Sequence, residues 1–219
     1  MRACSLTDVG KTRLMNQDYV YYSTKPVGNL PNLFILADGM GGHKAGDMAS
    51  RYTVETMVKL VSDSDENDPI SILNSAIQQV NTDILRKAQE SEDYNGMGTT
   101  LVVSCIRDSI LHVANVGDSR LYILGEDLKQ VTRDHSLVEE MVTRGALDRN
   151  AARYHEQKNM ITRAIGGDTT VLPDFFPIDN VIERILKTTA DIDEAATKLV
   201  ELANENGGRD NVSVIIIEY

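Results

Sequence analysis

Cysteine is scarce in this chain, and its placement excludes two kinds of site. Only Cys4 and Cys105 occur, far apart in the sequence. Neither has the close spacing of a thiolate zinc site, and two cysteines do not make a disulfide framework. We expect both to be small residues of the core.

Long apolar runs are also absent, which argues against a membrane protein. No stretch approaches the roughly 20 apolar residues that a transmembrane helix needs. The first twenty residues carry Arg2, Asp8, Lys11, Arg13 and Asp18, where a signal peptide would have an apolar segment. We therefore expect a cytoplasmic protein that does not bind membranes.

Positive charge is in short supply. The 33 acidic residues exceed the 22 basic ones, which gives a net charge of -11 and disfavours nucleic acid as a partner. An acidic chain can still bind a phosphorylated substrate if divalent cations lie between its carboxylates and the phosphate. The aspartates are therefore the residues to follow.

Composition and periodicity predict one α+β domain spanning residues 1–219. The chain is 42% hydrophobic and 25% charged, without repeats or linkers. Apolar residues spaced three and four apart predict a first helix that starts at Ala45 and carries Val54, Met57, Val58 and Val61. A second helix is predicted from Pro69 to Glu90, with Asp68 as its cap and a buried stripe at Ile70, Leu73, Ile77, Val80 and Ile84. Two further helices are predicted from Ser136 to Arg144 and from Asp193 to Glu205.

Short β-prone runs fill much of the remainder. We expect a strand at Leu33–Ala37, an antiparallel meander between Thr99 and Thr132, a strand in VLPDFF (171–176) and a last strand in VSVIIIE (212–218). Residues 91–98 are predicted to form a loop, and residues 145–167 a mobile flap. Segregated helices and antiparallel strands favour a layered α+β fold.

Three aspartates share one context, at a strand end beside glycine: Asp38, Asp118 and Asp210. Asp18, just before the apolar run YVYY, is a fourth candidate. Each alone could be a turn residue that bonds its own backbone. Together, carboxylates at one rim of a sheet would suit Mg²⁺ or Mn²⁺.

The motifs around these residues resemble those of the bacterial type 2C, metal-dependent protein serine/threonine phosphatases (PPM family). The resemblance rests on GxxR..NQD (10–18), ADGMGGH..G (37–46), GTT (98–100), NVGDSR (115–120), TRDHS (132–136), ITRAIG (161–166) and GGRDNVS (207–213), in the family's order. It implies two packed antiparallel β-sheets flanked by helices, an α-β-β-α sandwich. It also implies two or three Mn²⁺ or Mg²⁺ ions at one end of the sandwich.

The same resemblance assigns metal ligands. Asp38 would bridge two ions, the Gly39 carbonyl would bind the second and Asp210 the first. Asp118 would bind a third, weaker ion, and Asp18 would act at or behind the second ion, often through water. Gln17 is neutral where many relatives carry glutamate, so it is not assigned as a ligand.

The implied chemistry is hydrolysis by a water molecule that the two ions activate. Arg13 would grip the phosphate with its planar guanidinium; its alternative is a surface salt bridge. His43 is the candidate proton donor to the leaving alkoxide, unless a metal-bound water takes that role.

Six further residues, five of them in these motifs and His112 in the meander, are expected to support the fold or the site. His135 and His112 are interpreted as structural, and Thr99, Thr100 and Arg120 as supports of the site through packing and hydrogen bonds. Asp134 is either a turn or cap residue, which we favour, or an acid acting behind the ligands.

One family motif is absent. Relatives carry S/T-D-G-L after the strand that here reads DFFPID, and this chain continues from Asp179 directly to Asn180. The segment is missing through omission from this chain, an engineered deletion or natural variation. We favour omission, because losing a core strand would endanger the fold. In a true deletion the first ion keeps only two carboxylates, Asp38 and Asp210, and binds more weakly.

Three functions compete. The leading hypothesis is metal-dependent dephosphorylation of phosphoserine and phosphothreonine in proteins, by a monomer that opposes a bacterial serine/threonine kinase. The alternative is a pseudophosphatase that binds a phosphoprotein or a regulator without turnover. A phosphohydrolase acting on small molecules has less support.

Overall fold

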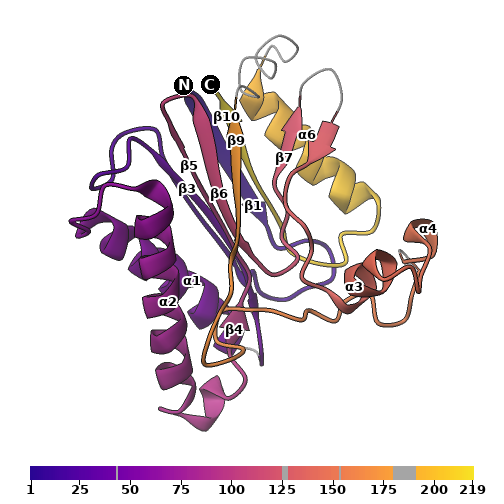
Figure 1. Ribbon diagram of the computed structural model, residues 1–219. Coiled ribbons are helices and arrows are strands. Elements are labelled where there is room, and N and C mark those ends of the chain that lie inside the picture. Colours follow the sequence, from indigo (N-terminus) through magenta and orange to yellow (C-terminus); the bar gives the residue numbers. More distant parts are fainter. Residues whose placement is uncertain (43, 125–127, 153, 180–190) are drawn as a thin grey trace.

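The computed structural model describes residues 1–219 except 43, 125–127, 153 and 180–190. It is an α+β fold in which antiparallel strands form the centre and helices lie on the outside (Figure 1). The strands are β1 (Arg2–Asp8), β2 (Asp18–Ser23), β3 (Leu33–Met40), β4 (Gly98–Thr99), β5 (Leu101–Arg107), β6 (Ile110–Val116), β7 (Tyr122–Leu124), β8 (Leu128–Gln130), β9 (Asp174–Asp179) and β10 (Val212–Glu218). The helices are α1 (Ala45–Ser62), α2 (Pro69–Ala88), α3 (Leu137–Thr143), α4 (Arg149–Ala152) and α6 (Ile192–Glu205), with a short 3₁₀ turn η1 at Glu92–Tyr94.

The described strands form three antiparallel groups. The largest runs in the order β2-β3-β5-β6-β9, and β4 pairs with the end of β3. β1 pairs with β10 along their whole lengths and packs against β2. β7 and β8 form a separate hairpin. The predicted meander is therefore divided, because only its first two strands join the large sheet.

Helices α1 and α2 cover one face of the large sheet (Figure 1). The predicted helices at 45 and 69 are confirmed, and Asp68 caps α2 by accepting a hydrogen bond from the Ser71 N–H at 2.9 Å. Leu73 and Ile77 are fully buried. Ile70 does not join their stripe: it is 37% exposed.

Helix α6 packs on β1 and β10. It buries Ile192, Ala196 and Val200, whereas Leu199 and Leu202 are at least half exposed. All seven residues of β10 are only half-buried. This layer of the fold is therefore thinner than the layer formed by α1 and α2.

Other predictions are confirmed with changed boundaries. Ser136 caps α3, as the helix predicted at 136–144 requires. Gly98 belongs to β4 and not to a loop. The strand predicted at 171–176 begins only at Asp174, after Pro173, which has no N–H to give to a ladder. In the predicted flap, residues 149–152 form α4, and Ile165 is buried and exchanges backbone hydrogen bonds with Thr99.

Both cysteines are free and buried, as predicted. Burial raises the pKa of the Cys105 thiol to about 12, so this thiol stays protonated near neutral pH. No helix in the described part of the chain has the length and apolar character to cross a membrane.

Candidate metal centre

Asp18 and Asp38 lie directly opposite each other on neighbouring strands. Asp18 begins β2, Asp38 lies near the end of β3, and the two are register partners. The Cβ atoms of such partners lie about 5 Å apart, so the two carboxyl groups are neighbours. The sheet therefore joins two of the predicted ligands through a fixed strand register.

The electrostatics of Asp38 show which groups surround it. Desolvation, followed by the charges of Asp18, Asp210 and Asp118, raises its pKa to about 7, whereas Arg13 acts in the opposite direction. All four predicted carboxylates and the predicted phosphate-binding arginine therefore belong to one neighbourhood. Burial is also the main cause of the raised pKa of Asp18 and of Asp118.

Asp210 and Arg13 come from two loops that touch. Arg13 Nη2 donates to the Asp210 carboxylate at 3.0 Å. The loop after β1 is held to the loop before β10 because the Lys11 and Thr12 N–H groups both donate to the Gly208 oxygen. Gly10, at φ +78°, permits this approach, because a β-carbon there would lie 2.1 Å from the backbone carbonyl oxygen of Asp210.

Gly39 is required by packing. A β-carbon on Gly39 would lie 2.0 Å from the Gly46 carbonyl oxygen, in the first turn of α1. The Gly39 N–H donates to the Gln17 carbonyl oxygen at 3.0 Å. β3 therefore meets the start of α1 through backbone atoms, a reason for glycine that the sequence alone did not reveal.

Thr99 and Thr100 hold the backbone of Asp38. The Thr100 hydroxyl accepts from the Asp38 N–H at 3.0 Å, and the Thr100 N–H and Thr99 hydroxyl each donate to the Asp38 carbonyl oxygen at 2.9 Å. Thr100 Oγ1 also lies 2.7 Å from Ser119 Oγ, next to Asp118. The predicted supporting role of both threonines is confirmed.

The donor chemistry of this neighbourhood fits Mn²⁺ or Mg²⁺. The side chains are carboxylates, and closely spaced like charges of this kind repel until a cation lies between them. In the described residues, however, no three His, Cys, Asp or Glu side chains converge closely enough to enclose an ion as they stand. The ligand set is thus an acidic cluster whose individual metal contacts remain predictions.

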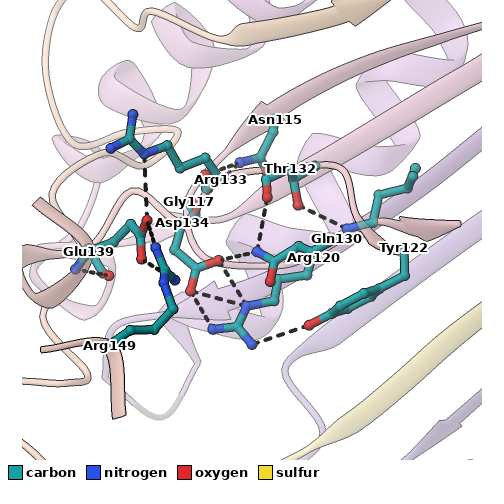
Figure 2. A network of polar contacts seen from close by, with 12 residues as sticks. Asn115, Gly117, Arg120, Tyr122, Gln130, Thr132, Arg133, Asp134, Glu139 and Arg149 are labelled. Carbon is teal, nitrogen blue, oxygen red and sulfur yellow. Dashed lines mark hydrogen bonds and ion pairs between the residues drawn. The ribbon is translucent and has the colours of Figure 1, made fainter. Parts of the chain in front are cut away.

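Asp134 and Arg120 form an ion pair that the sequence did not predict. Arg120 Nε lies 2.8 Å from Asp134 Oδ1, and Gln130 Nε2 donates to the same oxygen at 3.1 Å (Figure 2). Ser136, and not Asp134, caps α3, so the favoured cap interpretation of Asp134 is wrong. Asp134 also raises the pKa of Asp118, after burial, so its charge acts on that carboxyl group.

Two histidines of the motifs have different outcomes. His43, the predicted proton donor, lies outside the described residues. His135 is buried and contacts Gly117, the residue before Asp118. Its signal in the sequence was its place in TRDHS, which carries no metal-ligand spacing.

Comparisons with known proteins agree with this geometry. Residues 10–159 match the family described as Protein phosphatase 2C. The chain is 35% identical to the serine/threonine phosphatase stp of Listeria innocua over 251 positions, which cover all of this chain and 96% of the relative. Since this chain has 219 residues, at least 32 of those positions are gaps in it.

Solved structures are similar over nearly the whole chain. The serine/threonine phosphatase of S. agalactiae superposes with a TM-score of 0.87 at 33% identity, covering 98% of this chain and 97% of that one. The catalytic domain of the phosphatase PstP, solved in complex with two manganese ions, superposes with a TM-score of 0.81 at 30% identity, covering 98% and 96%.

Proposed function

Because the chain belongs to the protein phosphatase 2C (PPM) family of metal-dependent serine/threonine phosphatases, we propose that it hydrolyses phosphoserine and phosphothreonine in proteins. Its substrates would be the products of a bacterial serine/threonine kinase, and it would act as a cytoplasmic monomer. The observation that carries the proposal is the cluster of carboxylates around Asp38, with the charge of Arg13 beside it.

Five groups would hold the ions. We assign Asp38 as the bridge, the Gly39 carbonyl and Asp18 to the second ion, Asp210 to the first and Asp118 to a third. Two divalent ions held there, Mn²⁺ or Mg²⁺, would supply an activated water for attack on phosphorus.

Arg13 would bind the substrate phosphate. Its guanidinium is half exposed and is paired with Asp210, whose side chain is 64% exposed. An exposed ion pair of this kind contributes about 1 kcal/mol or less, so a phosphate group competes for the guanidinium easily. His43 would protonate the leaving alkoxide, on the strength of its place in ADGMGGH.

A phosphothreonine peptide tests the function. We expect turnover with Mn²⁺, loss of turnover with a chelator, and loss in Asp38→Asn. Activity that survives chelation, or is unchanged in Asp38→Asn, would overturn the metal mechanism. Asp47→Asn is a matched control, because it also neutralises a carboxylate, but on α1.

The second candidate is a pseudophosphatase, and the internal gaps favour it. At least 32 aligned positions have no counterpart in this chain, and the S/T-D-G-L motif, with its aspartate, is missing from the sequence. An ion held by two carboxylates in place of three should bind more weakly. Calorimetric titration of Mn²⁺ into this chain and into the Listeria relative would separate the cases. Peptide binding without turnover at saturating Mn²⁺ would favour the pseudophosphatase.

A further inference from the structure

His135 holds both polar groups of the residue that precedes Asp118. The Gly117 backbone N–H donates to His135 Nδ1 at 3.0 Å, and the backbone N–H of His135 donates to the Gly117 carbonyl oxygen at 2.9 Å. Gly117 has φ +106°, and a β-carbon on it would lie 2.7 Å from the side chain of Thr100. The backbone that presents Asp118 is thus fixed by Thr100 on one side and by the imidazole on the other.

These contacts determine the tautomer of His135. Nδ1 accepts a hydrogen bond, so the proton of the neutral ring is on Nε2, which lies 3.2 Å from Asp174 Oδ2 at the start of β9. Arg163 Nη1 donates to Asp174 Oδ1 at 3.0 Å; it also lies 3.3 Å from Nε2, where both groups are donors. Burial lowers the pKa of His135 and favours the neutral ring.

Neighbouring contacts tie the same two segments together without touching Gly117 N–H. Asn115 Nδ2 donates to the Arg133 oxygen at 3.1 Å, and the Leu121 N–H donates to the Thr132 hydroxyl at 3.0 Å. Figure 2 shows the Arg120–Asp134 pair between them. Residues 115–121 would therefore stay attached to residues 130–135 if the imidazole were replaced, so a His135 variant need not unfold this region.

We propose that His135 is a positioning residue for Asp118. The Nδ1 atom of His135 fixes the Gly117 peptide, and thereby the direction in which the Asp118 carboxylate faces the acidic cluster. The inference rests on the proposed function only in taking Asp118 as a ligand. It differs from a structural role because the two ring nitrogens have separate effects: Nδ1 acts on Gly117, and Nε2 only on Asp174.

Two substitutions separate the ring nitrogens. In His135→Asn, Oδ1 stands the same number of bonds from Cβ as Nδ1 and keeps the acceptor for Gly117. In His135→Gln, the amide reaches the place of Nε2 and the Gly117 N–H loses its acceptor. We expect His135→Gln to weaken Mn²⁺ binding at the site that Asp118→Asn removes by about 10- to 100-fold, as for other residues that orient ligands. His135→Asn should bind Mn²⁺ as the unsubstituted protein does.

Mn²⁺ binding is measured by electron paramagnetic resonance, independently of turnover, and the Gly117 amide is followed by ¹⁵N NMR. The Gly117 amide shift should move in His135→Gln and not in His135→Asn. In an Asp118→Asn background, His135→Gln should have no further effect on Mn²⁺ binding, because it acts through Asp118.

Equal losses in His135→Asn and His135→Gln, or a Gly117 amide unchanged in His135→Gln, would overturn the inference. The inference would also be overturned if His135→Gln weakened Mn²⁺ binding as much in the Asp118→Asn background as in the otherwise unsubstituted protein. Absence of turnover in the unsubstituted protein would instead contradict the proposed function, while the Mn²⁺ and amide measurements would still decide the role of His135.

Discussion

The helix pair α1–α2 and the single helix α6 cover their strands to different degrees. On the α1–α2 side, Leu73, Ile77 and Met57 are completely buried in one large apolar cluster. On the α6 side, the cluster has three buried members, Cys4, Ile192 and Ala196, and the strand beneath it is half-buried throughout. In the described part of the chain, the layer under α1 and α2 is therefore largely buried, whereas the layer under α6 is only partly buried.

The candidate site draws from both layers. Asp18 and Asp38 belong to β2 and β3 beneath α1, where strand register and the hydroxyls of Thr99 and Thr100 fix them. Asp210 belongs to the loop between α6 and β10, and its side chain is mostly exposed. The position of Asp38 is therefore set by the sheet, whereas that of Asp210 depends on the less buried layer.

The largest expected effect is the loss of phosphatase activity when a proposed ligand is neutralised, and it should differ between Asp38 and Asp210. Asp38→Asn should lower kcat/KM by more than the roughly 10- to 100-fold typical of residues that only orient a ligand. Asp210→Asn should lose activity that a higher Mn²⁺ concentration partly restores, because the fixed Asp38 remains. Phosphatase assays over a Mn²⁺ series measure both. Full rescue of Asp38→Asn by Mn²⁺, with none for Asp210→Asn, would reverse the comparison.

Truncating one side chain in each layer tests the packing difference directly. Ile77→Ala, in α2, should lower the free energy of unfolding by about 2–5 kcal/mol, since it opens a cavity in a sealed core. Leu199→Ala, in α6, should change it by about 0.5 kcal/mol or less, because that side chain is already 50% exposed. Urea unfolding of the metal-free protein measures both; similar losses would show that the layers are equally packed.

The pH dependence of the metal-free protein sharpens the comparison for Asp38. Its pKa rises from the ordinary 3.8 to about 7 on folding, so the folded state binds the proton more tightly. The stability it contributes is therefore present below about pH 4 and lost as the pH rises toward 7. Asp38→Asn should flatten this part of the urea-unfolding profile, and saturating Mn²⁺ should oppose the loss. A steeper profile in the variant would contradict the assignment.

The most local effects are expected at the helix caps. Asp68 accepts from the Ser71 N–H at the start of α2, and Asp191 accepts from the Asp193 N–H at the start of α6. Asp68→Ala should lower global stability by about 1 kcal/mol. Asp191→Ala should instead speed amide exchange within α6 alone, if that layer opens locally. Hydrogen exchange by mass spectrometry tells the two outcomes apart; a purely global effect in both would refute local opening.

The sequence predicted elements whose stabilising contacts are local or periodic. Asp68 and Pro69 marked the start of α2 correctly, because a cap and a first-turn proline act within one turn. Ile70 was wrongly placed in the buried stripe, since periodicity groups side chains on one helix face but does not show whether another element covers each of them. β4 was missed because Gly98 and Thr99 pair with the end of β3, far away in the sequence.

The members of the acidic cluster were predictable, but the contacts that position them were predictable only in part. The motif order identified Asp18, Asp38, Asp118 and Asp210 by resemblance, and the geometry brings them into one electrostatic neighbourhood. The link from His135 to Gly117 was not predictable, because a single histidine without ligand spacing gives no signal. Its two partners, Gly117 after β6 and Asp174 at the start of β9, are brought together by the pairing of these two strands.

The direct contact between the backbones of Gly39 and Gly46 has a consequence for how variable this loop can be. A β-carbon at Gly46 would lie 2.5 Å from Gln17 Nε2, and one at Gly39 would meet a carbonyl oxygen at 2.0 Å, whereas a β-carbon at Gly42 would meet nothing within 4 Å. Position 39 can therefore hold no other residue without moving α1, and position 46 only if Gln17 shifts and the Gly39 carbonyl oxygen, 2.9 Å away, also moves, whereas position 42 is open to exchange. Glycines that look alike in the printed sequence thus differ widely in their freedom to mutate.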